Sequence, residues 1–186
     1  TPEYQLLFAY AQIQQKKFDA AKVSINTLAD AHRGDALAPA IQELNAELYE
    51  AMGQFDTAAF IYKQLVNEDP SRARAHWSLA RYYLTKGDIP RAVSHLEQTA
   101  KHWPKHLGSR YNMAVLKIQE GSLQEAGKWL AECYRINRAD AGVLEQLGLL
   151  FEKKGSLPEA VRYWQKAVAV SKDAPIAKEK LARYTI

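Results

Sequence analysis

Two histidines four residues apart form the pair in this sequence that most suggests metal binding. On one helix, His102 and His106 would share a face, where two imidazoles can hold a zinc ion. Pro104 lies between them and breaks a helix at this point. We therefore expect two separate, solvated side chains and no metal site.

The other reactive residue types give no catalytic site either. Cys133 is the single cysteine, so an internal disulfide is excluded. Its place among small helical residues predicts a buried, unreactive thiol. The sequence contains no glycine-rich phosphate loop, no His-Glu-x-x-His motif and no Gly-x-Ser-x-Gly motif. We expect a protein that is not an enzyme and needs no cofactor.

Composition indicates an ordinary globular protein. Hydrophobic residues make up 47% and charged residues 25% of the 186 residues, and the formal net charge is +4. That charge is too small to indicate a nucleic-acid partner. The longest apolar stretch, residues 143–151, is interrupted by Glu145 and Gln146, and a membrane span needs about 20 apolar residues. We expect neither nucleic acid nor a membrane span.

One motif recurs five times along the chain. Its large apolar residues, at spacings of 37, 34, 34 and 34, are Phe18, Phe55, Ile89, Leu123 and Leu157. Three residues after each comes an alanine: Ala21, Ala58, Ala92, Ala126 and Ala160. Nine residues before each comes another small residue: Ala9, Ala46, Ala80, Ala114 and Gly148. Small side chains at two fixed places predict pairs of helices in close contact, and the face that they share must be buried by stacking.

Each period predicts two antiparallel helices joined by a tight turn. A glycine stands two residues before the large apolar residue in every copy except the first, and glycine ends many helices. The second helix then needs a cap. The expected caps are Asp88, a capping box of Ser122 with Glu125, and one of Ser156 with Glu159.

The period of 34, the paired small residues and the glycine turn resemble the tetratricopeptide repeat. The resemblance covers about residues 2–174 and implies an all-α fold, a right-handed α-solenoid of antiparallel helix pairs. In a single array over 1–186, the repeats are expected at about 2–36, 39–72, 73–106, 107–140 and 141–174. A capping helix at about 175–185 follows, which could equally begin a sixth repeat.

The resemblance also implies a concave groove, lined by first helices, that binds a peptide or a helix of another protein. The register places there Glu43, Glu47 and Glu50; Arg74, Trp77, Arg81 and Leu84; Tyr111, Val115, Ile118 and Gln119; and Glu145, Leu149 and Glu152. Spacings of three and four put each set on one helix stripe. We expect Trp77 and Tyr111, equivalent in adjacent repeats, to anchor the partner. The alternative is that these side chains pack against neighbouring first helices.

Charge is unevenly distributed along the chain. Residues 40–70 carry a net charge of −5, and residues 72–110 carry +6. Either the two segments attract each other across a solvated face, or together they form a bipolar surface that orients a charged partner.

These observations predict a non-catalytic scaffold that binds a protein or peptide. One alternative is self-assembly, with arrays stacking end to end through Leu181, Ile186 and the first helix around Tyr4 and Leu7. The other is the adaptor arm of a larger enzyme or of an assembly or secretion machine. The start at Thr1, without Met, favours a chain that is processed or cut from something longer. The cytoplasm and a bacterial periplasm both remain open as locations.

Overall fold

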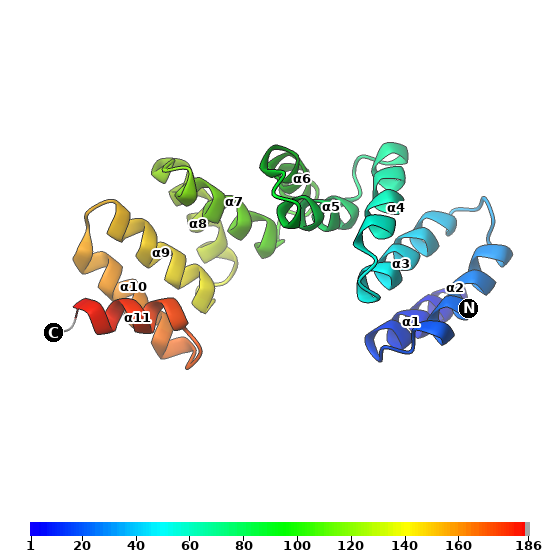
Figure 1. Cartoon of the computed structure of the whole chain (residues 1–186), viewed down its shortest axis with the longest axis horizontal. Coiled ribbons are helices and arrows are strands. Elements are labelled where there is room, and N and C mark those ends of the chain that lie inside the picture. The colour runs from blue at the N-terminus through cyan, green and yellow to red at the C-terminus, as the bar shows by residue number, and fades with distance from the viewer. Residues whose placement is uncertain (185–186) are drawn as a thin grey trace. The chain divides into compact units, whose positions relative to one another are not determined.

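A computed structural model describes residues 1–184. These residues form eleven helices and no strand (Figure 1). The chain divides into two compact units, residues 1–102 and residues 103–186, which we name unit 1 and unit 2. Ile186, expected in an end-to-end contact, and the last residue of the expected 175–185 helix lie outside the described residues. None of the helices in residues 1–184 has the length and apolar character required to cross a membrane.

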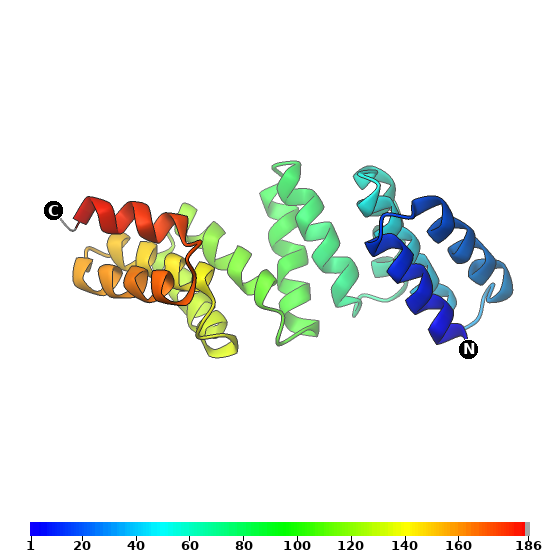
Figure 2. The ribbon, with the colours of Figure 1, turned by 90° about the horizontal axis from the view of Figure 1, so that it is seen from below.

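Unit 1 consists of three helix pairs. Their helices are α1 (Pro2–Gln14), α2 (Phe18–Ala31), α3 (Ala38–Ala51), α4 (Phe55–Glu68), α5 (Ala73–Thr85) and α6 (Ile89–His102). Each helix packs against the next, and the first helices α1 and α3 also touch. The two views in Figures 1 and 2 show the members of each pair lying side by side.

Unit 2 consists of two helix pairs and one further helix. Its helices are α7 (Leu107–Gln119), α8 (Leu123–Ile136), α9 (Ala141–Lys153), α10 (Leu157–Val170) and α11 (Pro175–Tyr184). The first helices α7 and α9 touch, and α11 packs on both α10 and α9. The helix α11 therefore takes the place that the first helix of another pair would occupy.

The turn within each pair has the predicted left-handed residue. Gly53, Gly87, Gly121 and Gly155 all have φ between 71° and 82°. In the first pair the same place is held by Lys16, whose φ is 57°. The hydrogen bonds match as well: Lys17 N donates to Gln12 O at 2.9 Å, as Gln54 N donates to Tyr49 O at 2.8 Å. The first turn thus keeps its geometry without the residue that favours it.

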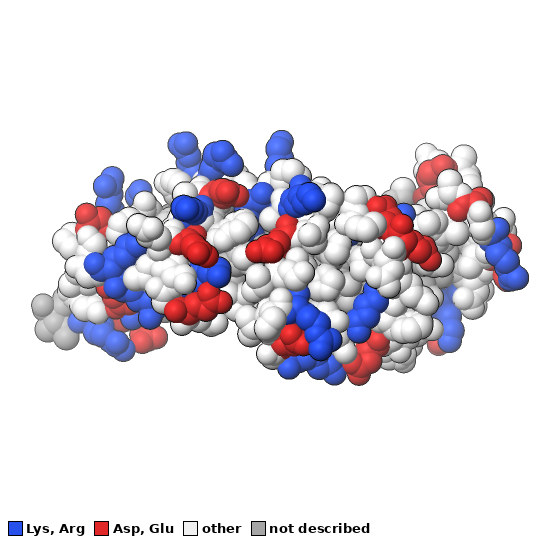
Figure 3. All heavy atoms as spheres, turned by 90° about the horizontal axis from the view of Figure 1, so that it is seen from above, with Lys and Arg blue, Asp and Glu red and all other residues white. Residues whose placement is uncertain are grey.

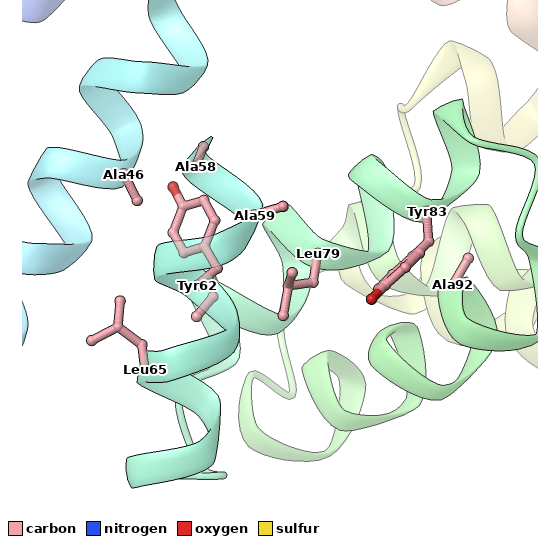
Figure 4. Close-up of a cluster of buried hydrophobic side chains, with 9 residues drawn as sticks. Ala46, Ala58, Ala59, Tyr62, Leu65, Leu79, Tyr83 and Ala92 are labelled. Carbon is pink, nitrogen blue, oxygen red and sulfur yellow. The ribbon is translucent and has the colours of Figure 1, made fainter. Parts of the chain in front are cut away.

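The two sets of small residues form the helix contacts as predicted. All ten residues are buried, and the nine alanines among them are at most 1% exposed. Large residues fill the space beside them, as Tyr62, Leu65 and Leu79 do beside Ala58 and Ala46 in Figure 4. In unit 2, Gly148 leaves room for the indole of Trp164, which a Cβ at Gly148 would approach to 2.2 Å.

Of the predicted caps, only Asp88 is formed as expected. Asp88 Oδ1 accepts a hydrogen bond from Arg91 N at 3.2 Å. Ser122 and Ser156 make no side-chain cap, so both predicted capping boxes are wrong. Their ψ angles of 62° and 73° lie outside the extended region that an N-cap requires. Ser156 Oγ instead donates to Glu159 Oε2 at 2.6 Å.

Candidate functional site

An open pocket lies among the first helices of unit 1. Its volume is about 370 Å³. Helix α1 contributes Leu6, Leu7 and Tyr10, α3 contributes Ala40, Glu43, Leu44 and Glu47, and α5 contributes Arg74. We name this the α1–α3–α5 pocket. One wall is apolar and the opposite rim is charged, a composition typical of protein-binding surfaces.

The partner-binding residues predicted from the sequence include three of this pocket's residues, Glu43, Glu47 and Arg74. They do not include its apolar wall of Leu6, Leu7 and Tyr10. The sequence does contain a signal for this wall: the apolar residues of α1 are spread over several faces of the helix. A helix that packs on one side only has its apolar residues on a single face.

The charged rim consists of ion pairs between α3 and α5. Arg74 donates a hydrogen bond to Glu47 and lies 3.9 Å from Glu43, and Arg72 lies 3.6 Å from Glu43. Burial raises the pKa of Glu43, while the positive charges of Arg74 and Arg72 oppose that rise. The opposite charges of residues 40–70 and 72–110 thus form direct ion pairs at these four side chains.

A second, narrower pocket of about 190 Å³ lies between α3, α4 and α5. Two groove residues, Glu50 and Arg81, line it. The Glu50 carboxylate accepts hydrogen bonds from Tyr62 Oη at 3.2 Å and from Ser78 Oγ at 3.4 Å. Burial, and then the charge of Glu50, raises the pKa of the Tyr62 phenol. Glu50 therefore lines the pocket as a hydrogen-bond acceptor, and Arg81 lines it with an exposed side chain.

The two aromatic residues expected as anchors lie in different units. Trp77 on α5 is half-buried, and Leu84, two stripe positions further, packs partly buried against the unit 1 core. Tyr111 on α7 is half-buried and accepts a hydrogen bond from Gln146 Nε2 at 3.4 Å. Its ring lies close to Gly142, where a Cβ would be 3.5 Å from Cε2. The adjacency of Trp77 and Tyr111 stays a prediction.

Within unit 2, the stripe expected on α7 is only partly accessible. Val115 is half-buried and Gln119 is exposed. Ile118 is only 5% exposed and belongs to the core formed with Leu130 and Val143. The expectation that Ile118 lies on an open surface is wrong, because α8 and α9 close over that side of α7.

The stripe expected on α9 is covered by α11. Glu145 is 6% exposed, and its Oε1 accepts a hydrogen bond from Ala177 N, at the start of α11, at 2.9 Å. Glu152 pairs with Lys180 at 2.7 Å, and Leu149 packs against the core that contains Trp164. A negative charge near a helix N-terminus is stabilising, so the carboxylate of Glu145 favours the position of α11 against α9. Glu145, Leu149 and Glu152 therefore hold this helix and do not line an open groove.

His106 and Cys133, the candidates for metal binding and for a reactive thiol, both have structural roles in unit 2. The expectation of a solvated side chain is wrong for His106, which is half-buried and caps α7: its Nδ1 accepts a hydrogen bond from Ser109 N at 3.1 Å. Cys133 is fully buried, as predicted, and burial raises its pKa to about 12. Among residues 1–184, no group of three or more His, Cys, Asp or Glu side chains could hold a metal ion.

Sequence reasoning missed a pair of histidines in unit 1. His76 Nδ1 and His95 Nδ1 lie 2.8 Å apart, and His76 Nε2 lies 3.1 Å from Pro70 O. Since only a protonated nitrogen can donate to that carbonyl, His95 Nδ1 donates to His76 Nδ1. Tyr83 stacks on His95, with ring centroids 5.5 Å apart. Burial, then the neighbouring His76, lowers the pKa of His95 to about 4.

Charged side chains of both signs are mixed over the visible face of each unit (Figure 3). On that face, small clusters of acidic and of basic side chains lie among uncharged ones.

Comparisons with known proteins find partial sequence similarity to two subunits of one complex and a similar fold in solved structures. The family model for subunit 3 of the anaphase-promoting complex (cyclosome) matches residues 51–133. The anaphase-promoting complex subunit CDC16 of Saccharomyces cerevisiae is 26% identical over 129 residues, which are 69% of this chain. The chain spans 15% of the length of that relative.

Solved structures share the arrangement of helices over nearly the whole chain. MamA superposes with a TM-score of 0.71 at 19% identity, covering 100% of this chain and 96% of MamA. YrrB, described as a tetratricopeptide-repeat protein with an unusual peptide-binding site, superposes with a TM-score of 0.73 at 14% identity. That match covers 95% of this chain and 89% of YrrB. At these identities the likeness concerns the fold.

Proposed function

Because this chain has the tetratricopeptide-repeat fold, with five helix pairs and a C-terminal helix, we propose that it is a scaffold that holds a peptide segment of another protein. Proteins of this fold are generally non-catalytic scaffolds that bind other proteins. We assign the segment to the first-helix face of unit 1, at the α1–α3–α5 pocket.

The open, part-apolar shape of this pocket is the observation that carries the proposal. Tyr10 is 40% exposed beside Leu6 and Leu7, so an apolar side chain of the partner can be buried there. Glu43, Glu47 and Arg74 face it from the other side and can hydrogen-bond to the partner's main chain. A segment with one large apolar residue between polar neighbours fits this arrangement.

Other groove residues extend the proposed path within unit 1. Trp77 and Arg81 follow Arg74 along α5, and Arg81 lies at the narrower pocket beside Glu50. In this proposal the aromatic ring supplies apolar area, and the guanidinium sets the orientation of a charged residue. In unit 2, Tyr111, Val115 and Gln119 remain candidates for a separate contact.

Selection from a peptide library displayed on phage, followed by binding titrations, tests the proposal. We expect Tyr10→Ala to weaken the selected peptides about tenfold, because a buried aromatic contact is lost. Trp77→Ala is expected to weaken those peptides that extend along α5. Phe60→Ala is the control, since Phe60 is 61% exposed on α4 and lies outside both pockets. Equal affinity for wild type and Tyr10→Ala, with the helical fold intact, would reject the assignment.

A further inference from the structure

A trough of about 520 Å³ lies between helices of unit 2, outside the stripes expected on α7 and α9. We name it the α8–α10 trough. Each repeat of a stacked array contacts only its neighbours. Because the trough lies between two pairs that already stack on each other, a further repeat at either end of the array would leave it open. Its lining includes Gly127, Lys128 and Ala131 on α8, Phe151 and Lys154 on α9, and Tyr163 on α10.

A lysine side chain covers the equivalent place in unit 1. Two periods of 34 residues earlier, Lys63 on α4 is the equivalent of Ala131. Lys63 Nζ lies 5.6 Å from the ring centroid of Tyr83, which is the equivalent of Phe151. Tyr83 is only 6% exposed, whereas Phe151 is half-buried. Ala131 therefore leaves open a space that unit 1 fills with a side chain of its own.

Aromatic rings form part of the wall of the trough. The ring of Phe151 stacks on that of Tyr163 with centroids 5.4 Å apart, and Tyr134 meets Tyr163 edge to face at 6.4 Å. All three rings are half-buried and hold one another in place. An apolar side chain of a partner can therefore bury more of their surface without ordering them first. The trough suits a large aliphatic or aromatic side chain.

Two lysines are the only charged side chains that line the trough among the described residues. Lys154 Nζ lies beside the backbone of Gly127, 3.7 Å from the place that a Cβ there would take, and Lys128 is exposed on α8. In the described part of the chain, neither lysine forms an ion pair. Lys166 adds a positive charge nearby, with Nζ 5.2 Å from the ring centroid of Tyr163. A negative charge is therefore favoured beside the apolar surface, and a positive charge is not.

Unit 1 shows how such a negative charge is held. Lys86, the equivalent of Lys154, pairs with Asp56 at 3.0 Å. The equivalent of Asp56 is Gln124, so unit 2 keeps the lysine and lacks the carboxylate. The trough thus lacks two groups that unit 1 supplies from its own chain: the side chain of Lys63 and the carboxylate of Asp56.

We propose that the α8–α10 trough binds a segment of another protein in which a large apolar residue stands within two positions of an aspartate or glutamate. The apolar side chain enters the space beside Ala131 and packs on Phe151. The carboxylate pairs with Lys154, as that of Asp56 pairs with Lys86. A basic residue is disfavoured there, because two lysines line the trough and no described carboxylate does. The trough belongs to unit 2 and is separate from the α1–α3–α5 pocket, so each proposal can fail without the other.

Filling the trough tests the recognition of the apolar residue. A library of random dodecapeptides displayed on phage is selected on the full chain, and the selected peptides are titrated against Ala131→Lys, the change that copies unit 1. We expect peptides with the stated pattern to bind Ala131→Lys about tenfold more weakly or worse, although this change adds a positive charge. Ala169→Lys is the matched control, because Ala169 is an exposed alanine on α10 that does not line the trough. The absence of such peptides, or an equal loss with Ala169→Lys, overturns the proposal.

A double-mutant cycle tests the role of the carboxylate. Lys154→Gln, and replacement of the peptide's acidic residue by its amide, should each weaken binding about threefold to tenfold. Because both changes remove the same ion pair, the two together should weaken binding little more than either alone. Additive losses, or peptides that depend on Ala131 but carry no acidic residue, overturn the proposal. Tyr10→Ala should leave these peptides unaffected, which separates them from peptides held at the α1–α3–α5 pocket.

Cross-linking identifies the source of the segment. A photoreactive p-benzoylphenylalanine would replace Gln124, an exposed residue that lines the trough, in the source cells, and the cross-linked peptide would be sequenced. A peptide from a different protein with an apolar residue close to an acidic one supports the proposal. A cross-link to a second copy, to another part of the same polypeptide or to a segment without this pattern overturns it.

Discussion

At the scale of single residues, two features of unit 1 lower the stability of the folded state: the left-handed conformation of Lys16 and the contact between His76 and His95. Lys16 adopts the left-handed conformation that four glycines adopt in the other turns, and its side chain is exposed. His76 and His95 share a hydrogen bond in a half-buried site where protonation is unfavourable. Both features predict measurable effects on stability.

Replacing Lys16 by glycine should stabilise the protein. A residue with a Cβ loses about 1 kcal/mol in the left-handed region, and the exposed lysine makes no hydrogen bond or ion pair in the structure that this change would remove. We expect Lys16→Gly to raise the free energy of unfolding by about 1 kcal/mol in a urea titration. Gly121→Lys, at the equivalent turn, should lower it by a similar amount. An unchanged or lower stability of Lys16→Gly would contradict this account.

The histidine pair should make the protein less stable in mild acid. The unfolded chain protonates these imidazoles near pH 6.5, whereas folded His95 does so only near pH 4. Between these values the unfolded state binds more protons, so the free energy of unfolding falls as the pH falls from about 6.5 to 4. For a half-buried group, solvent screening reduces the fall to about 1 to 2 kcal/mol.

Denaturant titrations at several pH values check this dependence. His95→Phe keeps the stack on Tyr83 and should flatten the fall, while His32→Gln, at a loop position, should retain it. The same pH slope in His95→Phe and wild type would show that other groups cause the acid sensitivity.

At the scale of elements, close approach between helices is set by small residues at fixed places. One close approach is that of α9 and α10, where Gly148 leaves space for the indole of Trp164. The other pairs hold alanine at this place, with second-helix residues of smaller volume opposite: Ile25, Tyr62, Leu96 and Leu130. The pair Gly148 and Trp164 thus acts as one packing unit.

Gly148→Ala should therefore destabilise the protein although alanine favours helices. The new Cβ would lie 2.2 Å from Trp164 Nε1, and such overpacking costs about 1 to 3 kcal/mol. Gly127→Ala on α8 is the matched control. Its Cβ would meet Leu150 Cδ2 at 3.5 Å, an ordinary contact, so helix propensity should raise stability by about 1 kcal/mol. Thermal or urea unfolding measures both changes, and a stabilised Gly148→Ala would refute the packing argument.

At the scale of the whole molecule, unit 1 and unit 2 each have their own buried cores and their own internal ion pairs. Part of the charge difference between residues 40–70 and 72–110 is neutralised inside unit 1. Glu43 pairs with Arg72 just before α5, Glu47 pairs with Arg74 on α5, and Asp56 pairs with Lys86 at 3.0 Å. In unit 1, the side chains of Tyr4, Leu7 and Phe8 on α1 are exposed.

Native-state hydrogen exchange should show α1 to be the least protected first helix of unit 1. Helix α1 packs against α2 and α3 only, whereas α3 is covered by helices before and after it. Because opening costs less where less apolar surface is buried, we expect faster exchange in α1 than in α3. Equal protection of α1 and α3 would contradict this account.

The sequence by itself determined the helix pairs, the turns and the small contact residues, which the structure confirms, and the all-α fold class, which similar solved structures share. These features repeat with the period of the chain, and each depends on neighbours within one helix hairpin. The tertiary structure decided the rest: the pairing of Glu47 with Arg74, the contact of His76 with His95, and the seat of α11 on Glu145. Such contacts join different helices, and they depend on how each helix is rotated and how far its side chains reach. Periodicity fixes neither of these, so only the packed molecule shows that α11 covers α9 while the outer face of α1 stays open.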